Sequence, residues 1–447
     1  MAELIIIGGG LAGSEAAWQA ARQGAEVVLF EMRPLHMTEA HRTPLLGELV
    51  CSNSLRSQEL ATGPGLLKKE LEIAGSLVMN AARAAAVSAG SALAVDRTLF
   101  AEFITKSLER HPRITVVREE VKEIPGSLAV LATGPLTSGA MAEALRSLVG
   151  GEYLYFYDAV APIIDAGSID YGKAYRASRY GKGGDDYVNC PMTREEYERF
   201  YDALREADTV HCRAFEDIKV FEGCMPVEVM AERGRDTLRF GPLKPVGLPD
   251  PQTGKIPYAV VQLRPENREK TAYNMVGFQT RLKWPEQKKV FRLIPGMEQA
   301  EFLRFGSMHR NTFINAPLHL DNDLTFKGRD TLYGAGQITG VEGYIESTAM
   351  GLLAGVHAAR RLRGKPALLP PRASAHGSLV AHLTGSDPRL FQPSNINFGL
   401  LPAGDGTILG IRDKKMRRAA MADVALREWS AYSYTMGLNG EPRAPDK

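Results

Sequence analysis

The chain has 447 residues, more than one hydrophobic core usually supports, which excludes a small binding module and predicts several domains or one enlarged by an insertion. Apolar residues make up 44%, and no apolar run approaches the roughly 20 residues that cross a bilayer, so no membrane partner is expected. With a net charge of +2, an anionic partner must be bound by local basic clusters. The first residues lack the pattern of an export signal and the four cysteines are widely separated, which together predict a cytoplasmic protein with free thiols.

Near the N-terminus, a glycine-rich turn separates an expected strand from an expected helix. Residues 4–7 are apolar and predict a buried strand, and residues 14–23 are rich in Ala and predict a helix. We expect Gly8 to permit the bend, Gly10 to let the backbone approach a pyrophosphate, and Gly13 to let helix and strand pack closely. The pattern predicts a dinucleotide site with its phosphates at the helix N-terminus. The alternative is a glycine-rich turn without a ligand.

An acidic residue follows the next expected strand. Residues 25–30 form a second apolar run that ends in Glu31. At this position a carboxylate accepts hydrogen bonds from both hydroxyls of an adenosine ribose, whereas a phosphorylated ribose would be repelled. The pattern serves NAD and FAD alike, so later segments must distinguish between them.

Two later segments favour a flavin. Residues 130–134 are similar to the strand and Ala-Thr-Gly crossing of two-dinucleotide-binding flavoproteins. Residues 332–344 resemble the closing flavin motif of that superfamily, with Gln337 in place of its usual Asp, and a small-residue helix is expected at residues 347–361. The alternative for this stretch is a loop followed by a packing helix. Motifs at both ends of the chain imply one cofactor domain interrupted by an insertion.

The predicted fold is therefore α/β, with a Rossmann-like two-dinucleotide-binding FAD domain and a large α+β inserted domain. From about residue 140 to residue 325, Ala-rich helical character gives way to aromatic residues, Gly-rich turns and short strand-like runs. We predict the first part of the FAD-binding domain at residues 1–139, the inserted substrate domain at residues 140–325, and the second part, with a basic C-terminal helix, at residues 326–447.

Two cysteines are the chemical candidates. Cys51 lies in a polar run close to an arginine, surroundings that can favour a thiolate, and Cys224 lies between Gly223 and Pro226, which indicate a turn that can present a nucleophile. The alternative for both is a small buried hydrophobic residue. The same alternative is favoured for Cys190 and Cys212. The histidines show no metal-ligand spacing with cysteines or carboxylates, and no metal is predicted.

Two basic groups are candidates for binding an anionic partner. Arg281 and Lys283 belong to a group of cations that includes one aromatic residue, Trp284, a mixture that suits phosphates and bases. Arg417 and Arg418 belong to a basic cluster at the start of an expected C-terminal helix. The alternative for each is a solvated surface.

Taken together, these segments resemble the folate- and FAD-dependent tRNA (uracil-54-C5)-methyltransferases of bacteria. The cysteine-bearing segments are far more specific than the glycine turn. The resemblance spans most of the chain and rests on residues 8–18, 31–34, 49–56, 94–97, 221–226, 308–315 and 340–344.

The resemblance implies methylation of C5 of a uridine in the T-loop of tRNA. It implies 5,10-methylenetetrahydrofolate as carbon donor, leaving tetrahydrofolate, and NAD(P)H as reductant of a bound FAD. By resemblance, Cys224 attacks C6 of the uracil, Cys51 removes the C5 proton or serves flavin-side chemistry, and His309 contacts the folate pterin, with a structural histidine as the alternative. No obligate protein partner is predicted. The predicted cofactor-binding residues are Gly8, Gly10, Leu11, Ala12, Gly13, Glu31, Met32, Arg33, Gly336, Gln337, Gly340, Val341, Glu342 and Gly343.

Three other functions remain open at this point. One is the related flavoprotein of wobble-uridine carboxymethylaminomethyl modification, which usually carries a longer C-terminal helical region. Another is an FAD-linked oxidoreductase acting on a small metabolite, with both cysteines structural. The third is a non-catalytic flavin-containing RNA-binding protein.

Overall fold

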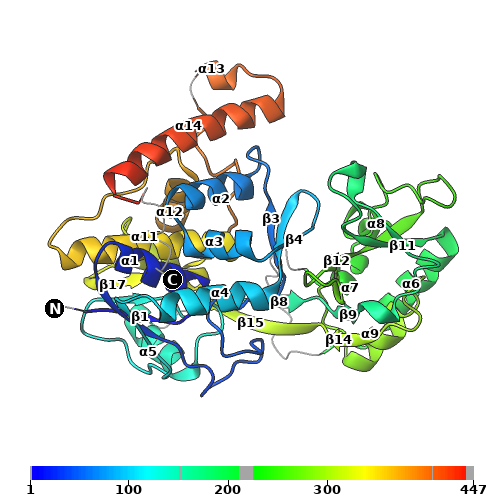
Figure 1. The fold of residues 1–447 in the computed structure, drawn as a ribbon, viewed down its shortest axis with the longest axis horizontal. Helices are drawn as coiled ribbons and strands as arrows, with labels where there is room; N and C mark the ends of the chain where they lie inside the picture. The colour runs from blue at the N-terminus through cyan, green and yellow to red at the C-terminus, as the bar shows by residue number, and fades with distance from the viewer. Residues whose placement is uncertain (1–2, 151–153, 211–224, 405, 439–447) are drawn as a thin grey trace.

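The protein folds into two lobes, and both ends of the described chain lie in the larger one (Figure 1). The structure is a computed structural model that describes residues 3–150, 154–210, 225–404 and 406–438. The side chains of residues 154–158, 309 and 310 are outside this description.

The larger lobe is built on a six-stranded sheet with the strand order β16-β17-β7-β1-β2-β6. All pairs are parallel except β16 with β17. The central strand β1 is almost entirely apolar because both faces of a parallel sheet are covered. The strands span Glu3–Ile7 (β1), Glu26–Phe30 (β2), Ile114–Val117 (β6), Ala129–Leu131 (β7), Thr325–Phe326 (β16) and Arg329–Gly334 (β17).

Two helices from opposite ends of the chain pack against each other beside this sheet. They are α1 (Leu11–Arg22) and α11 (Tyr344–Leu362), and both are rich in Ala and Gly. The backbones approach so closely that a Cβ built at Gly351 would lie 2.2 Å from the backbone oxygen of Ala12. The two segments that the sequence assigns to the cofactor are therefore neighbours.

Further helices and a small sheet cover the same lobe. The small sheet has the order β3-β5-β4, with β3 at Ser54–Ser57, β4 at Ala86–Val87 and β5 at Ala92–Val95. The C-terminal helix α14 is anchored by Trp429, which is buried, stacks on His376 at 3.9 Å between ring centroids and donates to the backbone oxygen of Glu70 at 2.7 Å. The helices span Gly63–Ile73 (α2), Leu77–Ala84 (α3), Arg97–Glu109 (α4), Gly139–Val149 (α5), Ala316–His319 (α10), Ala375–Gly385 (α12), Gly406–Leu409 (α13) and Lys414–Thr435 (α14).

The smaller lobe holds a second six-stranded sheet, which is antiparallel and has the order β10-β11-β12-β13-β9-β14. Its hydrophobic core draws on residues from Ala161 to Phe302 and is separate from the core of the larger lobe. The strands span Ile163–Asp165 (β9), Tyr175–Arg176 (β10), Val188–Met192 (β11), Ala259–Pro265 (β12), Ala272–Met275 (β13) and Phe302–Arg304 (β14). The helices span Arg194–Glu206 (α6), Val227–Glu232 (α7), Thr237–Phe240 (α8) and Trp284–Phe291 (α9).

A two-stranded antiparallel ribbon leads from one lobe to the other (Figure 1). It consists of β8 (Leu154–Val160) and β15 (Ser307–Phe313), so the chain enters and leaves the smaller lobe along adjacent strands. The predicted fold class, a Rossmann-like α/β unit interrupted by an α+β insertion, is confirmed. In the described part of the chain, no helix is both long enough and apolar enough to cross a membrane.

Candidate active site

The turn between β1 and α1 leaves a helix N-terminus open. Gly10 is the N-cap of α1 and supplies no side-chain cap, and a Cβ built on it would meet no atom within 4 Å. Gly8 has a φ of +102°, and a Cβ at Gly13 would lie 1.8 Å from the backbone oxygen of Gly8. Gly13 therefore closes the turn, while Gly10 leaves room in front of the helix. Free backbone N–H groups at such a terminus attract an anion such as a pyrophosphate.

Glu31 lies directly after β2 beside this turn, and it is held ionised. It accepts from the backbone N–H of Gly9 at 2.9 Å and from Nε of Arg33 at 2.9 Å. Burial favours the neutral acid, but the hydrogen bonds and positive charge of Arg33 outweigh it and lower the pKa of Glu31 below its ordinary value. An ionised carboxylate in this position suits the hydroxyls of a ribose.

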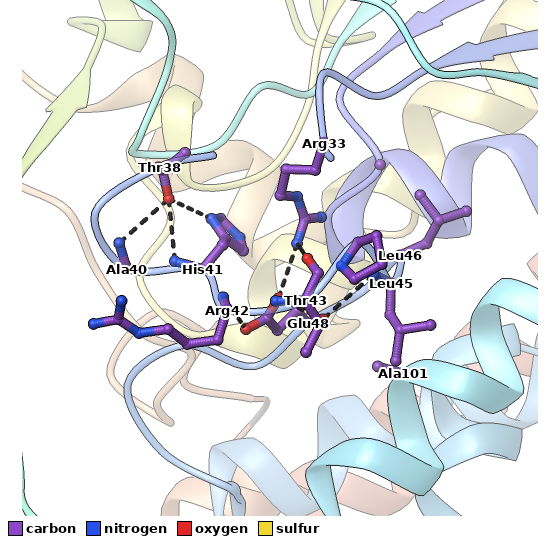
Figure 2. Close-up of polar contacts among 12 residues, drawn as sticks. Arg33, Thr38, Ala40, His41, Arg42, Thr43, Leu45, Leu46, Glu48 and Ala101 are labelled. Carbon is purple, nitrogen blue, oxygen red and sulfur yellow. Dashed lines mark hydrogen bonds and ion pairs between the residues drawn. The ribbon is translucent and has the colours of Figure 1, made fainter. Parts of the chain in front are cut away.

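A buried arginine links Glu31 to the loop that follows. Arg33 also pairs with Glu48 at 3.0 Å, and Glu48 accepts from the backbone N–H groups of Arg42 at 2.8 Å and Thr43 at 3.1 Å. Figure 2 shows Arg33 and Glu48 pointing toward each other across this loop. The loop is thus tied to the acidic residue by one guanidinium group. The position of this loop beside Glu31 is therefore set by residues of a single stretch of sequence, from Glu31 to Glu48.

These features enclose a cavity that fits FAD. The predicted cofactor residues in its lining are Gly8, Gly10, Leu11 and Ala12 from the turn, the segment from Glu31 to Arg33, and Gly336 with Gln337. The open helix N-terminus, the missing side chain at Gly10 and the ionised Glu31 match a pyrophosphate linked to an adenosine. Gly13, Gly340 and Val341 do not line this cavity; Gly13 packs on the turn, and Val341 is buried and bridges to Ser394.

A second cavity, which contains Cys51, adjoins the first. Both cavities have Val50, Pro135, Leu136, Gln337 and Tyr344 in their walls. The second is further lined by Glu342 and Gly343, which the sequence assigned to the cofactor, and by residues of the smaller lobe. A group bound in the first cavity would therefore be next to a group bound in the second.

The loop that carries Cys51 is held by the smaller lobe. The amide of Asn53 donates to the backbone oxygens of Val95 at 3.0 Å and Pro265 at 2.8 Å. Arg264 donates to Oδ1 of Asn53 at 2.8 Å and to Oγ of Ser52 at 2.9 Å. Two buried side chains, one from each lobe, thus fix the loop across the interface.

On the other side of the loop, Arg97 bridges the lobes. It donates to the backbone oxygen of Leu49 at 2.5 Å and to the two carboxylate oxygens of Glu266 at 2.6 and 3.2 Å. Burial opposes its charge, but the carboxylate of Glu266 outweighs burial and raises the pKa of Arg97 above its ordinary value. A permanent positive charge therefore lies close to the cysteine loop.

Tyr344 was not among the predicted site residues, although it touches Cys51. It begins α11, and its hydroxyl lies 2.9 Å from Sγ of Cys51. The signal that could have identified it is the hydroxyl of this tyrosine at the last position of the predicted flavin motif, residues 332–344. Asn53 lies in the cysteine-bearing segment of the resemblance, but its partner Arg264 carries no such signal, because their contact joins the two lobes.

Three predicted positions fall partly or wholly outside the description. Cys224 and Cys212 lie outside the described residues. His309 belongs to β15, but its side chain is not described. Val227, three residues after Cys224, donates its backbone N–H to the oxygen of Gln279 at 2.7 Å, and Gln279 lines the Cys51 cavity.

The two predicted basic groups lie in different lobes. Arg281 and Lys283 precede α9 in the smaller lobe and face carboxylates, Glu228 at 3.6 Å and Asp208 at 3.1 Å respectively. Arg417 and Arg418 belong to α14, at the opposite end of the molecule from α9 (Figure 1). The structure does not bring these groups together.

The remaining cysteine prediction concerns Cys190. It is fully buried in β11, and burial raises the pKa of its thiol to about 12, so the structural interpretation is confirmed. Among the described residues, no cluster of three or more His, Cys, Asp or Glu side chains is arranged to hold a metal ion.

Comparison with known proteins defines the family. Residues 3–366 match the family described as glucose inhibited division protein A. The chain belongs to this family. The methylenetetrahydrofolate–tRNA-(uracil-5-)-methyltransferase TrmFO of Geobacter sulfurreducens is 59% identical over 425 residues, which cover 95% of this chain and 97% of that relative. The protein of the same name from Moorella thermoacetica is 57% identical over 430 residues, covering 96% of this chain and 98% of the relative. The resemblance that the motifs indicated is confirmed.

A solved structure of a family member shares the fold. GidA of Aquifex aeolicus, in its form I crystal, superposes with a TM-score of 0.71 at 18% identity, covering 98% of this chain and 76% of that chain. This likeness supports the α/β architecture.

Proposed function

We propose that this protein methylates C5 of uridine 54 in the T-loop of tRNA, with 5,10-methylenetetrahydrofolate as carbon donor, FAD as cofactor and NAD(P)H as reductant. The observation that carries the proposal is the Cys51 cavity beside the dinucleotide cavity, with Tyr344 in the wall of both. Relatives named as methylenetetrahydrofolate–tRNA-(uracil-5-)-methyltransferases support it, since they are 55 to 59% identical and match over 97% of their own length.

The chemistry requires a thiolate. C5 of uracil is a poor nucleophile until a nucleophile adds to C6, and a cysteine adding there makes C5 an enolate-like carbon that attacks a one-carbon unit. We assign this addition to Cys224. In support, Val227 lies three residues further on and bonds to Gln279 in the wall of the Cys51 cavity.

A base must then take the proton from C5 before the sulfur leaves C6. We assign this step to Cys51, which lies in the cavity wall and is held from both lobes. The carbon donor is at the oxidation level of formaldehyde, and bound FAD, once reduced, supplies the two electrons that a methyl product requires. We further propose that His309, in β15, contacts the folate pterin.

The proposal includes the domain division. Relative to the expected bounds, residues 1–139 and 326–447, the FAD-binding domain also takes in α5 and α10, whose residues Met141 and Ala316 belong to the core of the larger lobe. The inserted domain that meets the tRNA substrate is the part of residues 140–325 that lies between β8 and β15. The separate hydrophobic core between Ala161 and Phe302 supports this division.

A tRNA has to be gripped through its phosphates, because extruding the target base costs a few kcal/mol. We propose that α14 supplies part of this grip. Lys414 and Lys415 lie in its first turn and Arg417 and Arg418 follow, with no acidic residue in that turn. Cations in the first turn of a helix oppose its dipole at a cost of about 0.3–1 kcal/mol each. The carboxylate of Asp413 at the N-cap counteracts this cost, and a bound phosphate would counteract it further.

The direct test is incubation of the purified holoenzyme with unmodified tRNA, methylenetetrahydrofolate and reduced nicotinamide, followed by nucleoside analysis. We expect 5-methyluridine at position 54 and release of tritium from C5-labelled uridine. Methylation at the wobble position would favour the carboxymethylaminomethyl flavoprotein, and the absence of tritium release would favour a small-molecule oxidoreductase or a binding protein.

Replacing Cys224 separates the nucleophile from the cofactor. Cys224→Ala is expected to abolish methylation and to retain the FAD content of the unaltered protein. Cys190→Ala is the matched control, because that thiol is buried in β11 and is expected to be dispensable for chemistry. Methylation by Cys224→Ala would remove this residue from the mechanism.

The tRNA surface is tested by a salt series. Neutralising Arg417 and Arg418 to Gln is expected to weaken tRNA binding and to lower the slope of log affinity against log salt by about 1 to 2, without loss of flavin. Arg194→Gln on α6 is the control, because this exposed cation pairs with Glu198 in the smaller lobe. Equal slopes for the double variant and the control would reject the role of α14.

A further inference from the structure

The hydroxyl of Tyr344 meets three partners, all in the cysteine loop. It lies 2.9 Å from the backbone nitrogen of Cys51, 3.1 Å from the backbone nitrogen of Ser52 and 2.9 Å from Sγ of Cys51. Tyr344 itself is held at the start of α11, directly after Gly343. These three contacts restrict the direction in which the hydroxyl hydrogen of Tyr344 can point.

Counting hydrogens settles the direction of the contact with sulfur. A backbone N–H can only donate, so the nitrogens of Cys51 and Ser52 both donate to the phenolic oxygen and occupy its acceptor positions. The oxygen has one hydrogen of its own, and Sγ of Cys51 is the third group within reach. If the thiol of Cys51 donated instead, the phenolic oxygen of Tyr344 would have to accept three hydrogen bonds. The hydroxyl hydrogen of Tyr344 would then have no acceptor among these three groups. The sulfur therefore accepts from Tyr344.

The charges around the loop favour the same direction. Arg97 and Arg304 both interact electrostatically with Cys51, and a negative sulfur is favourable to each. Nη2 of Arg304 is buried and has no hydrogen-bond partner among the described residues. Burial, and then the neighbouring Cys51, raise the pKa of Tyr344 well above its ordinary value, so the phenol keeps its proton.

We propose that Tyr344 is a positioning residue that donates its hydroxyl hydrogen bond to Sγ of Cys51 and so holds this sulfur as a thiolate aimed at the substrate proton. The inference rests on the proposed function for its last step. In that step the C5–H bond of the uracil adduct breaks and an S–H bond forms on Cys51. The electron pair left on C5 forms the C5–C6 double bond as the sulfur of Cys224 departs from C6.

The test measures the ionisation of Cys51 without tRNA or folate. The rate of iodoacetamide alkylation of Cys51 in the holoenzyme is followed by peptide mass spectrometry as a function of pH. In Tyr344→Phe, which keeps the ring and removes the hydroxyl, we expect the midpoint to rise by about one pH unit, so that the rate near neutral pH falls about tenfold.

Two controls separate this role from a structural one. Tyr187→Phe removes a hydroxyl that also crosses the lobe interface, where it donates to the backbone oxygen of Ala89 at 3.1 Å, and its midpoint is expected to match the unaltered protein. The melting temperature and the flavin content of both variants show whether either substitution disturbs the packing of the protein. An unchanged midpoint in Tyr344→Phe, whether or not its melting temperature falls, would overturn the proposal.

The assay also separates this inference from the proposed function. Alkylation of Cys51 needs neither tRNA nor folate, so a raised midpoint in a protein that methylates no tRNA would support the hydrogen bond and refute the function. In an active protein, the pH profile of methylation is expected to shift in the same direction as the alkylation midpoint. A methylation profile that stays in place while the midpoint moves would overturn the base role of Cys51.

Discussion

The dinucleotide cavity and the Cys51 cavity adjoin, yet they are held by different kinds of contact. The first is supported by groups close together in the chain: the glycine turn, Glu31, and Arg33 with Glu48. The second depends on Arg264, which lies 211 residues from its partner Asn53. We therefore expect the dinucleotide cavity to keep its geometry when the contact between lobes is disturbed, and the cysteine loop to lose part of its support.

The largest effect is expected from closing the glycine turn. In Gly13→Val, the added Cβ would lie 1.8 Å from the backbone oxygen of Gly8, and backbone cannot yield as a flexible side chain does. We expect a loss of stability above about 4 kcal/mol together with loss of FAD. Thermal unfolding and flavin absorbance measure the two effects.

Gly10→Ala is the matched control for that turn. No atom lies within 4 Å of the added Cβ, so the protein without cofactor is expected to unfold at its usual temperature while its affinity for FAD falls. Equal losses of stability in both variants would contradict the distinction between a packing glycine and a ligand-facing one.

Breaking the contact between the lobes is expected to slow methylation without lowering the amount of bound FAD. Arg264→Met leaves Oδ1 of Asn53 and Oγ of Ser52 without their charged donor, at a cost of about 1–3 kcal/mol for buried groups. We expect methylation to fall between about fivefold and 150-fold, with FAD content unchanged. The rate of tRNA methylation in a single turnover and the FAD content from flavin absorbance are measured.

Arg176→Met is the control for this change, because Arg176 contacts the Tyr273 hydroxyl at 2.9 Å within the smaller lobe and does not line the Cys51 cavity. Its methylation rate is expected to stay near that of the unaltered protein. Loss of FAD from Arg264→Met would show that the two cavities are not supported independently.

A smaller effect is expected from loosening the loop beside Glu31. Glu48→Gln weakens the pairing with Arg33 and the acceptance from Arg42 and Thr43, and we expect FAD affinity to fall about tenfold, or about 1.4 kcal/mol. Titration of the protein with FAD measures it. Glu39→Gln, on the exposed part of the same loop, is expected to bind FAD normally.

The smallest effect concerns the strand that follows the cysteine loop. Lys68 is buried and donates to the backbone oxygen of Leu55 at 2.7 Å, and burial lowers the pKa of its amine to about 7. Since the folded pKa lies below the unfolded value, the unfolded state binds more protons between the two, and stability rises with pH above about 7. We expect a rise of about 1 kcal/mol relative to Lys68→Met in denaturant unfolding between pH 7 and pH 8. Parallel stability curves for the two proteins would contradict the buried, neutral amine.

The sequence predicted the parts of the molecule whose contacts are local. The strand, glycine turn and helix, and the acid after β2, are specified by neighbouring residues, and the structure has β1, α1 and β2 where they were expected. Cys51 was identifiable from its residue type and from the resemblance. Helix α11 was predicted from residue 347 and begins at Tyr344, because the glycine motif runs directly into it.

The anchors of the cysteine loop could not be predicted, since they depend on how the lobes meet. Arg264 and Glu266 lie at the end of β12 and beyond it, where no local pattern connects them with Asn53 or Arg97. The sequence could not show that the basic group of Arg281 and Lys283 lies far from that of Arg417 and Arg418. It shows that cations are close together in the chain, but not on which face of the folded protein they lie.

The paired strands β8 and β15 have a consequence for how the chain is assembled during translation. Strand β7 ends at Leu131 and has β17, ending at Gly334, as its outer neighbour, so the ribosome must complete the whole smaller lobe before that neighbour exists. In the interval the nascent sheet presents β7 as an open edge, which is a site for mispairing between chains. Rapid folding of the smaller lobe as a unit would shorten this exposure, because it brings β15 back alongside β8 and delivers β17 to its place.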